Sequence, residues 1–238
     1  MRLLLDGAEP GGFNMAADAW LVDGNETALR LYGWTAPTLS LGYAQKADWI
    51  DWKVVRSRQV SVVRRPSGGR ALLHQHELTY ALALPCQGAC LREEFARLTG
   101  WVGDTLAGLG IRLRQSQVKP RAGRDPGCMA VAGFGELVGP TGKLVGSAQL
   151  RRGKRLLQHG VIPFCLDHEL HRCLLGDSQP GADLASLGHG PIAAEAFAQA
   201  FTRATGQRLT PQPWSAHERH QIEAQAHQYE LLERQVCP

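Results

Sequence analysis

The 238-residue chain is short of lysine, of excess charge and of long apolar runs. Its 26 basic and 22 acidic side chains leave a formal net charge of only +4, and five of the bases are lysines. Dedicated nucleic-acid-binding domains gather more positive charge on one face, so we expect no nucleic-acid partner. No apolar run approaches the roughly 20 residues that span a bilayer, and Asp6 interrupts the leucines at the N-terminus. We therefore expect no membrane contact and a cytoplasmic location.

Cysteine is sparse as well. There are six in a chain that is long enough to bury a stable core without disulfide bonds. In a reducing compartment each thiol is a small buried hydrophobe, a metal ligand or a nucleophile. The densest Cys/His run is Cys165–Cys173, and His74–Glu77 also holds metal-ligand types. One compact run cannot easily surround a tetrahedral zinc ion, so we expect no metal. We also expect no cofactor.

Apolar periodicity predicts helices at 12–22 and 91–109, and strands at 28–34, 39–41, 60–64, 78–84, 136–138, 143–150 and 156–164. The last three strands form antiparallel hairpins. From Pro191, placed in a first turn, the pattern is helical; Gly206 ends one helix and Ser215–Glu218 is a capping box for another. Hairpins clustered between helices favour an α+β fold with a largely antiparallel or mixed sheet over a parallel doubly wound one. Without a linker, 1–238 is expected to be one domain, with 165–238 mainly helical.

A glycine-rich segment joins two of the predicted strands, and residues 65–74 read Arg-Pro-Ser-Gly-Gly-Arg-Ala-Leu-Leu-His. Paired glycines let a ligand or a backbone approach closely, and flanking arginines offer donors to an anionic or carbonyl group. The spacing matches neither the dinucleotide fingerprint nor the P-loop. On the residues alone, a hairpin-like turn with solvated arginines is an equally good interpretation.

The predicted strand 143–150 begins with one of the few lysines. Strict alternation divides it into two faces, one of Lys143, Val145, Ser147 and Gln149 and the other of Leu144, Gly146 and Ala148. A lysine at a strand end commonly extends to water, so its position alone does not establish a function.

Cys128 follows Asp-Pro-Gly, at the end of a predicted loop where an attacking thiol is accessible. A thiol with an ordinary pKa of about 8.5 is mostly protonated at neutral pH, and a nearby ammonium group stabilises the thiolate. Lys143 is a candidate for that group, although sequence alone does not place the two side chains in contact. His159, in Gln-His-Gly, is either a structural histidine or a site residue.

Three motifs, taken in order, carry a resemblance to a known family. They are the glycine segment with Glu77–Tyr80 after it, Gly142–Gln149, and Leu157–Gly160. Together they resemble the biotin/lipoate protein ligase superfamily, and specifically its octanoyl-acyl-carrier-protein:protein N-octanoyltransferases. The resemblance spans roughly residues 1–165 and implies the catalytic-domain fold of that superfamily.

The resemblance also implies site residues. A cysteine ahead of the lysine-bearing strand carries an acyl thioester in that family, and the lysine lowers the pKa of the thiol; by position these are Cys128 and Lys143. The residues implied to wall the substrate pocket are Arg65, Ser67, Gly68, Gly69, Arg70, His74, Gly146, Ser147, Ala148 and His159. One departure is Met129, which stands where an aromatic residue commonly follows the cysteine.

The implied reaction is a ping-pong transfer. The thiolate takes an octanoyl group from octanoyl-acyl carrier protein and passes it to a lysine of a lipoyl domain or of glycine-cleavage H protein. An ATP-dependent lipoate-protein ligase is the nearest alternative, but it needs no nucleophilic cysteine, and Arg70 stands where ligases have a third glycine. A non-catalytic protein that binds an acyl or biotin-like ligand is the other alternative, and it needs neither Cys128 nor Lys143.

Overall fold

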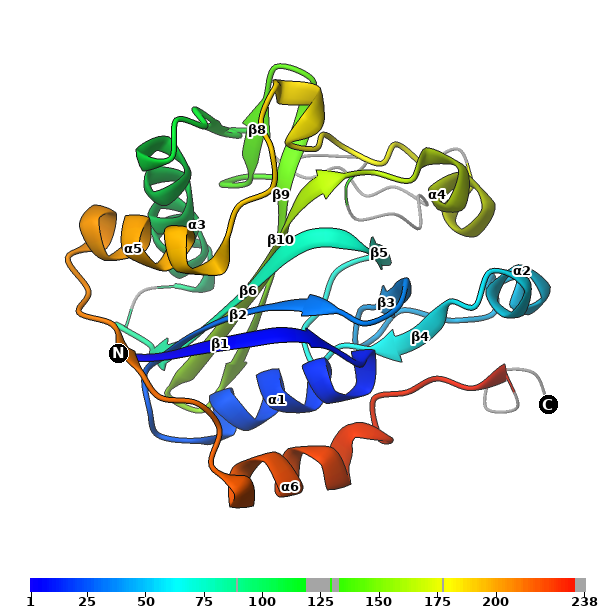
Figure 1. Cartoon of the computed structure of the whole chain (residues 1–238), viewed down its shortest axis with the longest axis horizontal. Coiled ribbons are helices and arrows are strands. Elements are labelled where there is room, and N and C mark those ends of the chain that lie inside the picture. The colour runs from blue at the N-terminus through cyan, green and yellow to red at the C-terminus, as the bar shows by residue number, and fades with distance from the viewer. Residues whose placement is uncertain (89, 119–128, 130–132, 177, 234–238) are drawn as a thin grey trace.

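The computed structural model describes residues 1–88, 90–118, 129, 133–176 and 178–233. Within them, the main sheet has the strand order β11-β1-β2-β6-β10-β9-β8-β7 (Figure 1). Its strands are β1 (Arg2–Glu9), β2 (Ala28–Trp34), β6 (His76–Pro85), β7 (Arg114–Gln115), β8 (Leu137–Gly139), β9 (Gly142–Arg152), β10 (Arg155–Cys165) and β11 (Thr210–Pro211). β1 runs parallel to β2 and β11, and the remaining pairs are antiparallel. The sheet is therefore mixed, and the α+β prediction is confirmed.

A second, smaller sheet holds both ends of the glycine segment. Its central strand β3 (Thr38–Leu41) pairs in parallel with β4 (Ser61–Arg64) and antiparallel with β5 (Leu72–His74). The strand predicted at 39–41 is present, but its hydrogen bonds go to these two strands and not to the main sheet. β4 leads into the glycine segment and β5 leaves it, so β3 fixes the separation of the two ends.

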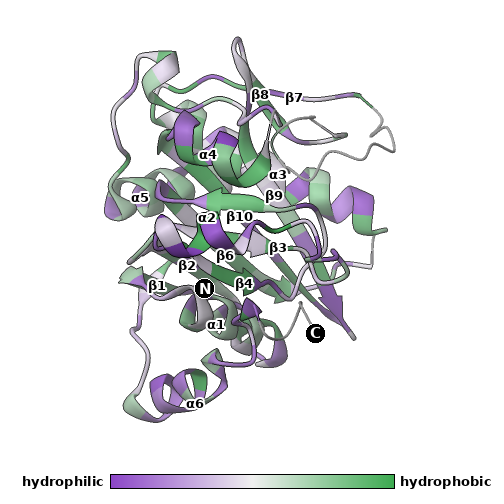
Figure 2. Ribbon diagram, turned by 90° about the vertical axis from the view of Figure 1, so that its right-hand side faces the viewer, coloured by the Kyte–Doolittle hydropathy of each residue, from purple (hydrophilic) through white to green (hydrophobic). Residues whose placement is uncertain are grey.

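Helices cover both faces of the main sheet. α3 (Leu91–Gly108) and α5 (Ala194–Thr205) lie on one face, where Leu98, Val102 and Phe201 pack into the largest apolar cluster. α1 (Gly11–Asp23) lies on the other face, and α6 (Ala216–Ala226) covers it from outside (Figure 1). Because α1 is enclosed between the sheet and α6, it is buried on nearly every side. In Figure 2 the central strands are coloured mainly hydrophobic and α6 carries more hydrophilic colour.

The remaining helices are short and peripheral: α2 (Trp52–Ser57), α4 (His168–Leu175) and a 3₁₀ turn, η1 (Ala185–Leu187). The described residues beyond β10 thus contain α4, η1, β11, α5 and α6. Gly206 ends α5 with a φ of 70°, and Ser215 and Glu218 form both hydrogen bonds of the predicted capping box. The placement of Pro191 in a first turn is wrong, since α5 begins at Ala194 after an extended Ala193.

The exposure of the four described cysteines does not fit one of the three predicted roles, that of a small buried hydrophobe. Cys90, Cys165 and Cys173 are exposed, Cys86 is half-buried, and all four are free. Within the described residues, no three His, Cys, Asp or Glu side chains come together in a way that would hold a metal ion. None of the helices formed by those residues has the length and apolar composition needed to cross a membrane.

Candidate active site

A narrow cavity lies where the two sheets and α1 meet. Side chains from β2, β3, β5, β6, β9 and β10 line it, with Met15 of α1. The structure brings together six of the predicted substrate-binding residues in its wall: Arg65, His74, Gly146, Ser147, Ala148 and His159. The β9–β10 register explains part of this convergence, because it sets His159 directly opposite Ala148.

An open groove adjoins the cavity. Ser147 and Ala148 line both spaces, so the groove lies next to the cavity at these two residues. Gly68 and Gly69 line the groove, opposite Phe95 of α3. Gly68 and Gly69, which were predicted to wall the substrate pocket, therefore border its approach instead of its interior.

The first of two buried polar chains behind the cavity is Asp18–His159–Ser67. The Oδ2 of Asp18 lies 2.7 Å from Nδ1 of His159, and Nε2 of His159 lies 2.5 Å from Oγ of Ser67. Both the Asp18 carboxylate and Ser67 are fully buried. Ser67 does not line the cavity; among the described residues, its hydroxyl contacts the site through His159.

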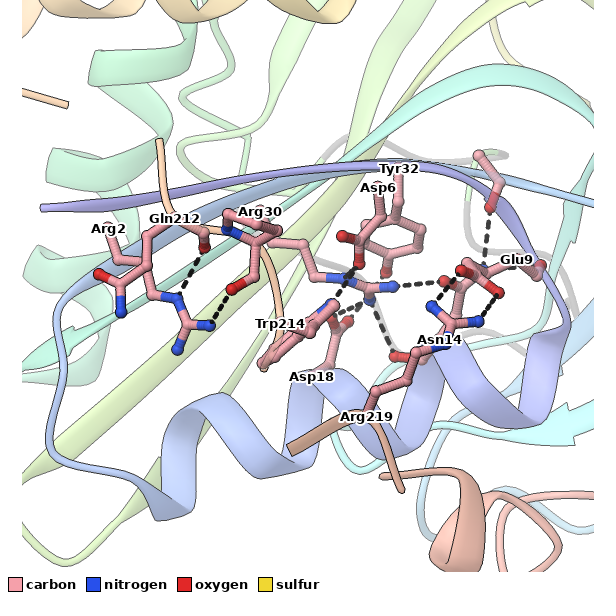
Figure 3. Close-up of polar contacts among 12 residues, drawn as sticks. Arg2, Asp6, Glu9, Asn14, Asp18, Arg30, Tyr32, Gln212, Trp214 and Arg219 are labelled. Atoms are coloured by element: carbon pink, nitrogen blue, oxygen red, sulfur yellow. Dashed lines mark hydrogen bonds and ion pairs between the residues drawn. The ribbon is translucent and has the colours of Figure 1, made fainter. Parts of the chain in front are cut away.

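Arg30 balances the charge of this chain. Its guanidinium donates to Asp18 at 3.0 Å, to Asp6 at 2.7 Å and to Asn14 at 2.7 Å (Figure 3). Burial by itself lowers the pKa of Arg30, but the two carboxylates outweigh that effect and raise it. Trp214, from the segment before α6, donates to the same Asp6 oxygen at 2.8 Å. The C-terminal part of the chain is therefore joined to the network behind the cavity.

The second chain is Glu77–His74–Ser40. Nδ1 of His74 lies 2.7 Å from Glu77, and Nε2 lies 2.7 Å from Oγ of Ser40. The His74 ring stacks on Trp34 with ring centroids 4.0 Å apart. Ser40 in turn accepts from Arg65 at 3.0 Å. Each histidine of the cavity is thus held between a buried carboxylate and a serine hydroxyl.

Arg65 links the second chain to the glycine segment. Its guanidinium donates to the carbonyl oxygens of Gly68 at 3.0 Å and of Arg70 at 2.6 Å. Gly69 has a φ of 95°, and a Cβ on Gly42 would lie 2.0 Å from its carbonyl oxygen. Glycine is required at both positions, one for its conformation and the other for the close approach. Arg65 is therefore buried beneath the loop, not solvated as the turn interpretation would have it.

Lys143 lies on β9 with its side chain 2% exposed, and its Nζ donates to Oε1 of Glu136 at 2.7 Å. The predicted division of the strand into two faces is wrong at this end. A register shift between β8 and β9 interrupts the alternation, so Leu144 and Val145 both join the main core. The Lys143 side chain reaches the other face, where its Cε lies 4.0 Å from the position of a Cβ on Gly146.

Cys128 lies outside the described residues. Its neighbour Met129 is buried, and its sulfur lies 2.7 Å from the position of a Cβ on Gly146. Gly181 contacts the same methionine. The methionine that replaces the expected aromatic residue therefore packs against the strand that carries Lys143.

Ser147 has a partner that the sequence did not indicate. The Tyr80 hydroxyl lies 2.7 Å from Oγ of Ser147, and burial raises the pKa of Tyr80. Asp18, Ser40 and Glu136 were missed as well, and Glu77 was noted only within a motif and among possible metal ligands. Asp18 offered one signal, since it is an acid in a helix that is otherwise almost entirely apolar from Phe13 to Leu21.

The fold has relatives of known structure. Protein Ta0514 from T. acidophilum with bound lipoic acid superimposes with a TM-score of 0.79 at 18% identity, over 95% of this chain and 93% of that chain. Lipoate-protein ligase A bound with ATP gives a TM-score of 0.78 at 18% identity, over 95% and 92%. These likenesses define the fold as that of a lipoate-ligase catalytic domain.

The chain belongs to the lipoyl protein ligase A/B catalytic domain family, whose model matches residues 10–204. Octanoyltransferase LipM of Kyrpidia tusciae is 32% identical over 255 aligned positions, which cover 93% of each chain. LipM of Carboxydothermus hydrogenoformans is 39% identical, over 66% of this chain and 62% of its own length. The resemblance noted from the three motifs is thereby confirmed.

Proposed function

We propose that this protein is an octanoyltransferase that acts in protein lipoylation, in the cytoplasm and without a cofactor. The observation that carries the proposal is the cavity, which adjoins an open groove at Ser147 and Ala148. The similarity to enzymes named octanoyltransferase LipM supports the choice of acyl group.

In the first half-reaction, the Cys128 thiolate attacks the thioester carbonyl of octanoyl-acyl carrier protein. A new C–S bond forms to Cys128, the bond to the phosphopantetheine sulfur breaks, and that thiolate leaves and takes up a proton. The neighbour Met129 supports this assignment, because it is buried against the strand of Lys143. An ammonium group near the thiol would stabilise the thiolate, which is the role proposed for Lys143.

In the second half-reaction, a lysine amine of a lipoyl domain or of glycine-cleavage H protein attacks the Cys128 thioester. The amide forms, the Cys128 thiolate leaves, and the amine proton is lost to solvent or to a site base. The octanoyl chain would occupy the cavity between Met15 and Gly146, with its carbonyl toward Ser147. Backbone amides of the glycine segment or the Lys143 ammonium group would stabilise the oxyanion that forms when the thioester carbonyl is attacked.

ATP-dependent lipoate ligation is the second candidate. A fold neighbour is a lipoate-protein ligase bound with ATP, but that chain is 18% identical, against 32–39% for the LipM relatives. The two functions differ in one requirement, since the ligase needs nucleotide and the transferase does not.

Intact-mass measurement after mixing the protein with octanoyl-acyl carrier protein, without ATP, tests the proposal. The expected result is an adduct of one octanoyl group that is absent from Cys128→Ala and that disappears when a lipoyl domain is added. Cys165→Ala, which removes an exposed thiol, is the matched control and should acylate normally. Full transfer by Cys128→Ala, or transfer only with lipoate and ATP, would overturn it.

A further inference from the structure

Asp18 lies where two sets of contacts meet. Its Oδ1 accepts from Arg30, and its Oδ2 accepts from the Tyr32 hydroxyl at 2.9 Å and contacts His159. Its carboxylate is fully buried behind His159, and Asp18 does not belong to the cavity wall. It therefore has no direct contact with a molecule in the cavity.

We propose that Asp18 is a positioning residue for acyl transfer. It orients the His159 ring so that the ring holds the Ser67 hydroxyl, and this contact fixes the glycine segment beside the groove. The inference rests on the proposed octanoyl transfer for its kinetic consequence. The orientation of His159 itself is a property of the folded protein and is measurable without a substrate.

The chemistry of the three groups sets the direction of the chain. A carboxylate only accepts hydrogen bonds, so Nδ1 of His159 carries a proton and donates a hydrogen bond to Asp18. In the neutral ring Nε2 then has a free lone pair and accepts from the Ser67 hydroxyl. Reversal of the ring tautomer would place two donors face to face unless the serine hydroxyl turned away.

The order Asp–His–Ser is also that of a hydrolytic triad, but Ser67 is not placed to act as a nucleophile. Ser67 is fully buried and lies outside the cavity wall, so its hydroxyl does not face a bound thioester. The two residues that follow it, Gly68 and Gly69, line the groove. Through them, a shift of Ser67 moves the border of the groove.

The loop has a second anchor that is independent of Asp18. Arg65 holds the carbonyl oxygens of Gly68 and Arg70 and depends on Ser40 and His74. Loss of the Asp18 anchor should therefore misplace the loop without releasing it. A misplacement of about 1 Å in a catalytic site can slow a reaction about 100-fold.

Asp18→Asn tests the inference, with Asp6→Asn as the matched control. Both carboxylates are buried and pair with Arg30, but only Asp18 contacts His159. In Asp18→Asn, the amide oxygen of the new side chain accepts from Arg30. The amide NH₂ group of that side chain therefore faces His159 and reverses the tautomer of the ring. We expect similar losses of stability in the two variants, and a fall of about 100-fold in kcat/KM for octanoyl transfer in Asp18→Asn alone.

Nitrogen-15 NMR of the His159 imidazole, assigned with His159→Gln, supplies the readout that a purely structural role would not change. We expect an unprotonated Nε2 in the wild type and in Asp6→Asn, and a protonated Nε2 in Asp18→Asn. Equal tautomers or equal kcat/KM in the two variants would overturn the inference. If the wild type forms no octanoyl adduct, the proposed function fails, while the tautomer comparison still decides the orientation of His159.

Ser67→Ala keeps the test decisive if Asp18→Asn does not fold. It removes only the last link of the chain, so we expect a fall of about 100-fold in kcat/KM for octanoyl transfer. Wild-type kinetics in Ser67→Ala would contradict the inference.

Discussion

The Lys143 ammonium and the Glu136 carboxylate form an ion pair 2.7 Å long, with side chains 2% and 13% exposed. The pair lies on the β8–β9 hairpin, and Glu136 lines the groove. A carboxylate that close offsets part of the field of the ammonium group at any neighbouring thiol. The proposed activation of Cys128 by Lys143 is therefore expected to be tempered by Glu136.

Opposite substitutions of this pair should change Cys128 reactivity in opposite directions. Lys143→Ala removes the positive charge and should slow alkylation of Cys128 by iodoacetamide about tenfold at pH 7, as a rise of one unit in the pKa of the thiol would. Glu136→Gln leaves the ammonium group in place and removes the negative charge of Glu136, so it should speed the reaction. Mass spectrometry of alkylated Cys128 against pH measures both effects. Shifts in the same direction, or none, would remove the electrostatic role of Lys143.

The contact between Gly42 and Gly69 should be costly to disturb. Gly42→Ala would place its Cβ 2.0 Å from the Gly69 carbonyl oxygen, so the backbone of one segment must move. We expect a loss of about 3 kcal/mol in the free energy of unfolding, measured by urea titration, and weaker acyl transfer. Gly7→Ala, which meets no atom within 4 Å, is the control and should change stability by less than about 0.5 kcal/mol. Equal stability of the two variants would show that the loop accommodates the methyl group freely.

Acid should weaken the attachment of α6. Glu218 pairs with Arg2 at 2.6 Å, and hydrogen bonds from Arg2 lower the pKa of Glu218 from 4.5 to about 2. A lowered pKa in the folded state gives stability that is present above pH 4.5 and is lost as the pH falls through 2.

Glu218→Gln removes this contribution. Because the side chain is 22% exposed and screened, we expect a loss of about 1–2 kcal/mol at pH 7, and less below pH 4.5. Glu233→Gln is the control. The Glu233 side chain pairs with Arg56 but is 45% exposed, so its loss should have little effect on stability. Thermal unfolding against pH measures both. A pH-independent loss in Glu218→Gln would contradict the assignment.

The sequence located the elements that bury one continuous apolar face. α3 and β2 match their predicted ranges closely because a single spacing of apolar residues runs through each of them. β1 was missed, since its leucines lie together in Leu3–Leu5 and show no alternation. The end of β9 was misread because a register shift depends on the partner strand, which a local pattern does not contain.

Local motifs identified Arg65, His74 and His159, which line the cavity. The carboxylate partner of His159 was out of reach for a different reason. Asp18 contacts His159 across 141 residues of sequence, so only the packing of α1 on β10 brings them together. The roles of Cys128 and Lys143 stay predictions.

The parallel pairing of β1 with β11 has a consequence for the order in which the chain folds during synthesis. β1 emerges long before its outer neighbour, which begins at Thr210, and α6, which covers α1, follows still later. β1 and α1 therefore keep an open sheet edge and an uncovered apolar helix until β11 and α6 have been made. A nascent chain arrested before residue 210 should bind chaperones and be cleaved by protease within β1 and α1, whereas the finished protein should resist.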